Sequence, residues 1–456
     1  MRIPWPPLHP GEDTDTGDRA CSKTVRSIAC HHSRVTSKQP GSSGVVRTDV
    51  VAAADRLAGV LAPTPLEPSR RLSERVGGQV LLKREDLSPV RSYKVRGAYN
   101  VLAQLSETER AAGVVCASAG NHGQGVAFAC SALDVHGRVY VPRTTPRQKR
   151  DRIADLGGDA IEVLVVGDTY DDAAAAALAD AGRTGATLVP AFDDARTIAG
   201  QGTVTLEIVA QLGQAPDVLV IPVGGGGLLA GTAAWLDGSP LGLQLFGVEP
   251  AGAACMAAAL AAGGPVALDK VDTFVDGAAV RRAGDITYPL VRDAGAQLVV
   301  VENGRLCTEI LALYQADGII VEPAGALAAA ALGDAVRPAP GQLTVCVLSG
   351  GNNDVSRYAE ILERSLVYEG RKHYFLVEFP QEPGALRRFL DDVLGPDDDI
   401  TLFEYVKRNN RETGPALVGI ELGRPDDLDA LLGRMRQAPA NFERVAADSP
   451  LFRFLV

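Results

Sequence analysis

Short apolar runs alternate with amphipathic stretches along most of this chain of 456 residues. Apolar and β-branched runs predict eight strands, at residues 80–82, 114–116, 139–141, 160–166, 218–222, 243–248, 298–301 and 343–348. Helical patterns lie between them, at residues 94–104, 125–133, 171–181 and 200–212. This alternation predicts βαβ units and a doubly wound, mainly parallel α/β sheet. Such sheets bind ligands at the carboxyl ends of their strands, where loops lead into helices.

The pattern changes at both ends of the chain, which predicts three segments. Residues 1–44 are rich in Pro, Ser, Thr and Gly and show no periodicity. They predict either a disordered extension or a start codon assigned too far upstream. Beyond residue 369, strands at 373–379, 399–406, 416–422 and near the end alternate with helices at 383–393 and 426–435. This βαββαβ order is the ferredoxin-like α+β plan, so we expect an α/β domain over 45–368 and a small α+β domain over 369–456.

Composition and charge narrow the classes of partner. The formal net charge of −11 gives the chain no electrostatic attraction to nucleic acid or to an anionic membrane. No apolar run reaches the roughly 18–20 residues that span a bilayer. The seven scattered cysteines include no Cys-x-x-Cys pair, which is typical of reduced thiols in a cytoplasmic protein and not of a disulfide framework. A metal site is also disfavoured, because the only histidine pair, His31-His32, lies in the non-periodic segment 1–44.

Four polar or glycine-rich segments adjoin predicted strands and helices. Lys94 opens an apolar helix, a setting that favours a neutral, nucleophilic amine. The segment 118–122 (Ser-Ala-Gly-Asn-His) offers backbone N–H groups to an anion such as a carboxylate. Four consecutive glycines at 224–227 form a nest that fits a phosphate. Ser349 offers a hydroxyl at a tight turn.

Each of these segments has an ordinary structural interpretation, as a solvated lysine or a glycine-rich turn. Their combination indicates an aldehyde cofactor that carries a phosphate and is held by a lysine, namely pyridoxal 5′-phosphate. The glycine run is not Gly-x-Gly-x-x-Gly, and no Gly-Lys-Ser/Thr follows it. Dinucleotide and Walker-type sites are therefore disfavoured.

Several motifs together resemble those of the fold-type II pyridoxal-phosphate enzymes: Ser92-Tyr-Lys-Val-Arg-Gly97, Ser118-Ala-Gly-Asn-His122, Gly224–Gly227, Glu322-Pro-Ala-Gly-Ala326 and Ser349-Gly-Gly-Asn352. From about residue 50 to its end, the chain is most similar to the biosynthetic threonine dehydratases (threonine ammonia-lyases). The resemblance implies that Lys94 is the catalytic lysine and binds the cofactor covalently. It also implies that the cofactor's 3′-oxygen contacts Asn121, its phosphate lies at Gly224, Gly225, Gly226, Gly227 and Leu228, and its pyridine nitrogen faces Ser349. The substrate carboxylate would lie at Ser118, Ala119, Gly120, Asn121 and His122.

The resemblance further implies an activity and its regulation. The expected reaction converts L-threonine to 2-oxobutanoate and ammonia, the first step of isoleucine biosynthesis. The single C-terminal ACT-like domain would bind an effector, expected to be L-isoleucine, and the enzyme would be a homotetramer. The alternatives are a dehydratase of L-serine or hydroxyaspartate and a non-catalytic amino-acid sensor. Serine racemases are similar, but Ala119 stands where they carry a second serine, and residues 251–255 lack their acidic metal ligands.

Overall fold

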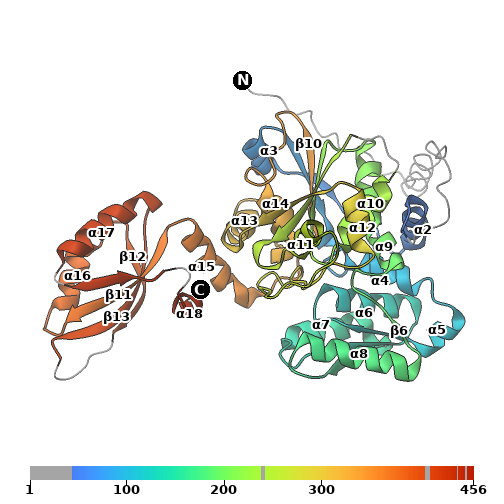
Figure 1. Ribbon diagram of the computed structural model, residues 1–456, viewed down its shortest axis with the longest axis horizontal. Coiled ribbons are helices and arrows are strands. Elements are labelled where there is room, and N and C mark those ends of the chain that lie inside the picture. The colour runs from blue at the N-terminus through green and yellow to red at the C-terminus, as the bar shows by residue number, and fades with distance from the viewer. Residues whose placement is uncertain (1–43, 238–241, 406–410, 439, 447–448, 456) are drawn as a thin grey trace, which may run out of the picture.

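A computed structural model of the chain describes residues 44–237, 242–405, 411–438, 440–446 and 449–455. Except for Gly44, the predicted N-terminal segment 1–44 therefore lies outside the described residues. Two sheets and their helices form a large unit, and helix α15 (Tyr358–Tyr368) leads from it to a small unit with a sheet of its own (Figure 1).

The larger sheet holds the strands that end at the glycine run and at Ser349. Its order is β1 (Leu66–Pro68), β2 (Gln79–Arg84), β10 (Leu343–Leu348), β7 (Val218–Pro222), β8 (Gln244–Pro250) and β9 (Gln297–Val301). All neighbours are parallel except β1 and β2. The core on one face includes α3 (Arg70–Val76), α13 (Asn303–Gln315) and α14 (Pro323–Ala331). The core on the other includes α2 (Arg47–Leu57), α9 (Ala195–Leu212), α10 (Gly227–Leu236), α11 (Cys255–Ala262) and α12 (Thr287–Asp293). Burial of both faces explains the continuous apolar runs of these strands.

The smaller sheet is parallel throughout and lies next to the larger one (Figure 1). Its order is β5 (Ile161–Val165), β4 (Gly137–Val141), β3 (Val114–Ala117) and β6 (Thr187–Leu188). Helix α8 (Tyr170–Thr184) covers one face, and α4 (Lys94–Leu102), α6 (Asn121–Leu133) and α7 (Arg147–Gly157) cover the other, while α5 (Glu107–Ala112) precedes β3. Helices on both faces of two mainly parallel sheets confirm the doubly wound α/β prediction.

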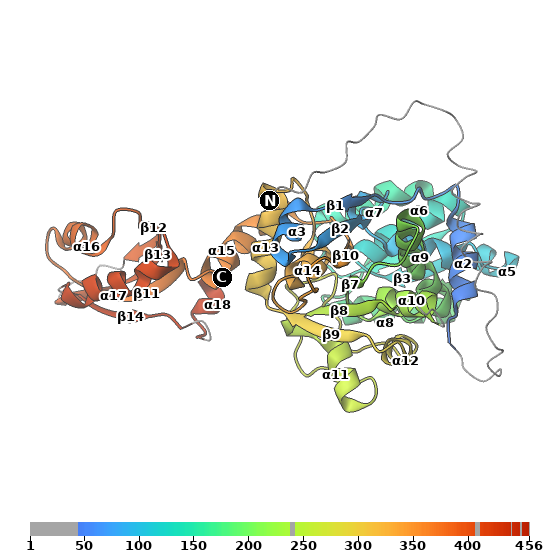
Figure 2. The ribbon, with the colours of Figure 1, turned by 90° about the horizontal axis from the view of Figure 1, so that it is seen from above.

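The small unit is the predicted ferredoxin-like fold. Its antiparallel sheet has the order β12 (Asp399–Tyr405), β13 (Thr413–Glu421), β11 (Lys372–Pro380) and β14 (Asn441–Arg444). Helices α16 (Ala385–Val393) and α17 (Leu428–Gln437) pack on it through a core that includes Phe375, Phe389 and Leu431. A last short helix, α18, covers Phe452–Leu455. Two views show this unit extending away from the large one (Figures 1 and 2).

Helix α6 begins at Asn121, four residues before the start that the sequence pattern predicts. The pattern His122-Gly-Gln-Gly125 reads as a loop because glycine disfavours helices. Here the glycines serve close packing instead, since a Cβ at Gly125 would lie 3.1 Å from the backbone nitrogen of Val95 in α4. Asn121 and His122 are therefore placed by a helix and not by a loop.

Glycines also bring α4, α9 and α10 into backbone contact. A Cβ at Gly200 would lie 2.6 Å from the carbonyl oxygen of Arg96, and a Cβ at Gly202 would lie 2.6 Å from that of Gly231. Because no side chain separates these helices, their relative positions are tightly constrained. The position of α4, which begins at Lys94, is thereby fixed against the larger sheet.

We expect Gly200→Ala to lower the free energy of unfolding by at least about 1–3 kcal/mol, because the new methyl group overlaps backbone atoms that cannot move alone. The matched control is Gly182→Ala in α8, where a Cβ meets nothing within 4 Å. This change should be neutral or stabilise the protein by up to about 1 kcal/mol, since alanine favours helix. Urea unfolding followed by circular dichroism measures both, and equal effects of the two substitutions would contradict the packing argument.

Candidate active site

Lys94 is partly buried and is the first residue of α4, which packs on α6 of the smaller sheet and on α9 of the larger one. Its Nζ donates a hydrogen bond of 2.8 Å to the carbonyl oxygen of Ala191 and lies 5.3 Å from the ring centre of Tyr93. Desolvation lowers the pKa of this amine to about 8, although the carboxylate of Glu322 opposes the shift. A useful fraction of Lys94 is therefore neutral and nucleophilic near neutral pH.

Asn121 is held by two side chains from the larger sheet's side of the site. Its Nδ2 donates a 2.5 Å hydrogen bond to Oε1 of Glu322, and its Oδ1 accepts one of 2.7 Å from Nδ2 of Asn352. Glu322 precedes α14 and is buried, which raises the pKa of its carboxyl to about 7. Sequence reasoning gave Glu322 and Asn352 no role. The feature of the sequence that could have identified Glu322 is its position, as a single carboxylate directly before the apolar helix Pro323–Ala331.

The glycine run forms a cup of backbone N–H groups at the start of α10. Gly226 precedes the helix with φ of +94°, a left-handed conformation that glycine adopts without strain. Thr287 Oγ1 donates to the carbonyl oxygen of Gly225 at 2.7 Å, and Ala230 N donates to that of Gly226 at 2.8 Å. Since the carbonyl and N–H of one peptide point in opposite directions, the N–H groups of Gly226 and Gly227 face the other way. The first N–H groups of a helix have no acceptor within it, which suits an anion.

Phe192 lies so close to this cup that Gly225 and Gly227 leave no space for a side chain. A Cβ at Gly225 would lie 2.5 Å from the ring of Phe192, and one at Gly227 would lie 2.9 Å from the Cβ of Phe192. Leu228 is buried in the core, so only its backbone is available to a ligand. The cup therefore binds through main-chain atoms.

The segment 118–122 leaves open space at its tip. Ser118 Oγ accepts a hydrogen bond of 3.3 Å from the nitrogen of Gly120, and a Cβ at Gly120 would meet nothing within 4 Å. Ala119 is partly buried. His122 is buried, and its Nε2 lies 2.8 Å from the carbonyl oxygen of Val189. Burial lowers the pKa of His122 to about 4, so the ring is neutral and donates to Val189. The ring of His122 therefore stabilises the position of α6, and only the backbone of His122 can bind a substrate carboxylate.

Ser349 connects the end of β10 to the start of α4. The carbonyl oxygen of Ser349 accepts a 3.2 Å hydrogen bond from the nitrogen of Tyr93, directly before Lys94. Its buried hydroxyl donates to the carbonyl oxygen of Ala324 at 3.3 Å, in the turn of α14 that follows Glu322. One short segment thus touches the elements that carry Lys94 and Glu322.

The four candidate segments come together through these contacts. Lys94 binds Ala191, whose neighbour Phe192 packs on the glycine cup, while Asn121 binds Asn352 in the segment that begins at Ser349. The donor set comprises an amine of lowered pKa, an amide, a cup of N–H groups and a hydroxyl. It fits a phosphorylated pyridine aldehyde.

Other buried groups play structural parts. Glu249 accepts hydrogen bonds of 2.7 and 2.8 Å from the backbone nitrogens of Met256 and Ala257, so both carboxylate oxygens are engaged, and burial raises its pKa to about 7. Within the described ranges no three His, Cys, Asp or Glu side chains form a metal-binding group. In the same ranges no helix is long and apolar enough to cross a membrane. The five cysteines described by the structure are buried free thiols.

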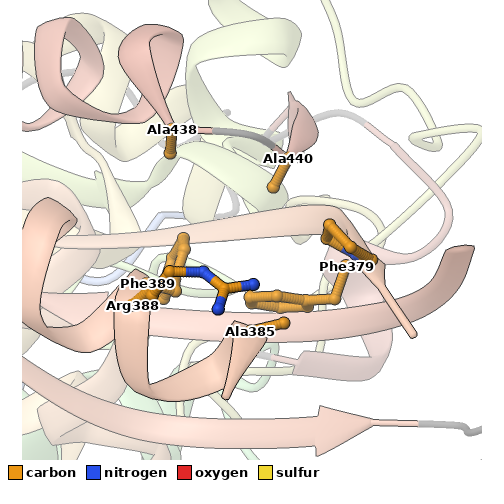
Figure 3. A pocket seen from close by; sticks show the side chains of 7 residues that line it. Phe379, Ala385, Arg388, Phe389, Ala438 and Ala440 are labelled. Carbon is orange, nitrogen blue, oxygen red and sulfur yellow. The ribbon is translucent and has the colours of Figure 1, made fainter. Parts of the chain in front are cut away.

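The small unit contains two hollows that share Phe379. One, of about 250 Å³, lies around the turn between β11 and α16 and is lined by residues 379–386 together with Phe403 and Tyr405. The other is smaller, and Figure 3 shows its lining of Phe379, Ala385, Arg388, Phe389, Ala438 and Ala440. The rings of Phe379 and Phe389 meet edge to face at 5.0 Å and form part of its wall.

Comparison with known proteins gives matches for both units. A family described as "Pyridoxal-phosphate dependent enzyme" matches residues 57–350, and one described as "C-terminal regulatory domain of Threonine dehydratase" matches residues 363–455. The biosynthetic L-threonine dehydratase IlvA of Mycobacterium tuberculosis (strain ATCC 25618 / H37Rv) is 62% identical over 425 residues, covering 92% of this chain and 99% of that protein. The IlvA of Bacillus subtilis (strain 168) is 46% identical over 407 residues, covering 89% of this chain and 96% of that protein.

Solved structures agree with this assignment. The processed form of threonine deaminase isoform 2 from Solanum lycopersicum superposes with a TM-score of 0.66 at 36% identity, covering 73% of this chain and 99% of that one. Maize serine racemase superposes with a TM-score of 0.65 at 28% identity, covering 71% and 99%. The fold, the donor set and these relatives together lead to one conclusion: the chain belongs to the biosynthetic L-threonine dehydratases, pyridoxal-phosphate-dependent threonine ammonia-lyases with a C-terminal regulatory domain.

Proposed function

We propose that Lys94 is the catalytic amine with which this chain deaminates L-threonine to 2-oxobutanoate and ammonia. The observation that carries this proposal is the amine of lowered pKa bound to Ala191, whose neighbour Phe192 packs on the glycine cup. When bound, pyridoxal phosphate supplies an electron sink that lowers the barrier to loss of the substrate's α-proton. Lys94 holds the cofactor and then accepts the α-proton at Nζ as general base.

The remaining site residues position the two ligands. The N–H groups of Gly224 to Leu228 hold the phosphate, Asn121 donates to the cofactor's 3′-oxygen, and the backbone of Ser118 to His122 holds the substrate carboxylate. Ser349 faces the pyridine nitrogen with a neutral hydroxyl. Because a hydroxyl carries no charge, it leaves the ring nitrogen less protonated than a carboxylate would. With Ser349 at this position, the bound cofactor would be a weaker electron sink, which suits early loss of the β-hydroxyl group over a long-lived carbanion.

We place the catalytic domain at residues 45–368 and the regulatory domain at 369–456, with the N-terminal segment 1–44 outside both. Two observations support this division: α15 ends at Tyr368, and β11, the first strand of the small sheet, begins at Lys372. Both domains belong to an enzyme of the cytoplasm.

The regulatory domain binds a branched-chain amino acid, L-isoleucine, in this proposal. The 250 Å³ hollow is lined by apolar groups of Leu386, Phe403 and Tyr405, which suit an aliphatic side chain. Its Pro383-Gly384 turn precedes α16, where backbone N–H groups suit a carboxylate. Since the chain has one regulatory domain, two subunits of a homotetramer complete each effector site. Inhibition then requires isoleucine to bind an inactive arrangement more tightly than the active one.

Lys94→Ala should abolish turnover, because one substitution removes both the cofactor's anchor and the base. We expect a loss larger than the roughly 10²–10⁴-fold that a single acid–base group contributes. The measurement is formation of 2-oxobutanoate from L-threonine, with L-serine assayed alongside to set the preference. The exposed Lys270 supplies the control, since Lys270→Ala should keep full activity. Activity of Lys94→Ala within about tenfold of wild type, or roughly 1.4 kcal/mol of barrier, would refute the assignment.

The Lys94 amine should titrate near pH 8 in the full-length chain without cofactor. A neutral aromatic aldehyde with borohydride trapping can label this amine. The rate of labelling should therefore rise as the pH increases through 8 and level off by about pH 9.5. An ordinary lysine, with its pKa near 10.4, would still gain reactivity there. Peptide mapping identifies the labelled residue, and Lys94→Arg supplies the blank. A rate that keeps climbing above pH 9.5 would contradict a desolvated amine.

A chain that ends at Glu369 should retain threonine dehydratase activity and lose inhibition by isoleucine. The reason is that isoleucine, in this proposal, binds to the small unit. Without that unit, isoleucine can no longer favour the inactive arrangement over the active one. Initial rates at increasing isoleucine or valine, measured for both chain lengths, test this. Equal inhibition of both forms, or no response of the full-length enzyme to either amino acid, would mean that the small unit does not bind these effectors.

A further inference from the structure

We propose that Glu322 and Asn352 are positioning residues that fix the amide of Asn121 with one N–H directed to the cofactor, and that the charge of Glu322 sets the protonation of Lys94. The inference rests on the proposed function of Asn121 and Lys94. It concerns two side chains that contact Asn121 from a helix start and from the segment after a strand end, more than 200 positions away along the chain.

The orientation of the Asn121 amide follows from its two partners. An amide offers one acceptor oxygen and two N–H donors. Here Oδ1 accepts from Asn352 and Nδ2 donates to Glu322. A flipped amide would set its oxygen against the Glu322 carboxylate and its NH₂ against the NH₂ of Asn352. Both contacts would be repulsive, so the amide is held in one orientation with a second N–H left over.

The partners of Asn121 are themselves fixed in place. Asn352 Nδ2 also donates to the carbonyl oxygen of Val90 at 2.8 Å, which determines its own orientation. The Glu322 nitrogen donates to the carbonyl oxygen of Gly350 at 3.1 Å. A Cβ at Gly350 would lie 2.3 Å from Oε1 of Glu322, and one at Gly277 would lie 3.7 Å from it. The carboxyl of Glu322 therefore lies in a slot formed by Gly277 and Gly350, and this slot leaves no space for a second conformation of the Glu322 side chain.

Glu322 is also joined to the segment that carries Lys94. Gly350, whose carbonyl oxygen accepts from the Glu322 nitrogen, forms an isolated antiparallel β-bridge with Ser92, two residues before Lys94. Ionised Glu322 raises the pKa of Lys94, against the effect of burial. The other charged or titratable groups that act on Glu322 or respond to it are Tyr93, Lys149 on α7 and Asp276. Burial and Asp276 raise the pKa of Glu322 to about 7, while Asn121, Lys149 and Lys94 favour its ionised form. Glu322 thus loses its charge as pH falls through about 7, and its support for the Lys94 ammonium is lost with it.

Three variants of the full-length chain separate geometry from charge. Glu322→Gln keeps an oxygen that accepts from Asn121 but removes the charge. Glu322→Ala and Asn352→Ala each remove one constraint on the Asn121 amide. Asn353→Ala is the matched control, because Asn353 lies in the same segment and binds the carbonyl oxygen of Val321 instead of Asn121.

The readouts are the dissociation constant for pyridoxal phosphate, from absorbance titration, and the pH midpoint of Lys94 labelling by the neutral aldehyde. Glu322→Ala and Asn352→Ala should weaken cofactor binding about tenfold or more, the scale of losing a buried, oriented hydrogen bond. Glu322→Gln should keep the affinity within about threefold and move the labelling midpoint below the wild-type value near pH 8. Asn353→Ala should match wild type in both measurements.

Two results would overturn the inference. Wild-type cofactor affinity in Asn352→Ala, which retains Glu322, would show that the amide needs no second constraint. A pH midpoint of Lys94 labelling in Glu322→Gln that equals or exceeds the wild-type value would show that the carboxyl does not act on Lys94. Failure of the proposed function is distinguishable, because the unmodified chain would then not bind pyridoxal phosphate or deaminate threonine. Should Glu322→Ala not fold, judged by circular dichroism, the other two variants decide both points.

Discussion

The buried guanidinium of Arg96 holds together the elements on which the active site is built. It donates at 2.8 Å to both carboxylate oxygens of Glu85, after β2, and at 2.6 and 2.9 Å to those of Glu207 in α9. Lys83 adds a second cation, 2.7 Å from Glu207. Two positive and two negative charges therefore balance in the interior. Losing one member would leave an uncompensated buried charge, which is strongly destabilising.

The position of Arg96 explains why this network matters for chemistry. Arg96 lies two residues after Lys94 in α4, and the glycine contacts at Gly97, Gly200 and Gly231 bring α4, α9 and α10 to backbone distance. Charge pairing and close packing thus set the position of the Lys94 amine relative to the larger sheet. Asn121 comes from the smaller sheet's side and is joined to the larger by Glu322 and Asn352. Hydrogen bonds as well as close glycine packing therefore join the elements of the two sheets around the site.

The connection to the regulatory domain begins beside this site. Arg357, just before α15, donates to the carbonyl oxygen of Phe274 at 2.6 Å, and its guanidinium lies 4.8 Å from the centre of that ring. Arg364 in α15 lies over the same ring at 4.5 Å. The segment that begins at Phe274 continues to Asp276 and Gly277, which border Glu322. One short segment, from Phe274 to Gly277, therefore contacts both α15 and the carboxyl of Glu322.

The sequence by itself determined the local structure and the main chemistry of this protein. Periodicity placed β7 and β10 at their observed bounds and the βαββαβ order of the small unit, because alternation and length are local properties. Lys94, Asn121, the glycine run and Ser349 were recognisable because each adjoins a strand or helix end. The start of α6 at Asn121 was missed, since its glycines serve contacts with α4 that no local pattern reveals.

Only the tertiary structure decided which of these groups face one another. Glu322 lies 201 positions from Asn121, and Asn352 lies 231 positions from it. Their meeting depends on the packing of α6, which belongs to the smaller sheet, against the segments before α14 and after β10 of the larger one. Likewise, the role of His122 as a brace toward Val189 follows from burial, which lowers its pKa and keeps it neutral. A linear pattern carries residue types and periods, whereas pairing across the sheets and the desolvation that shifts each pKa arise only when the chain is packed.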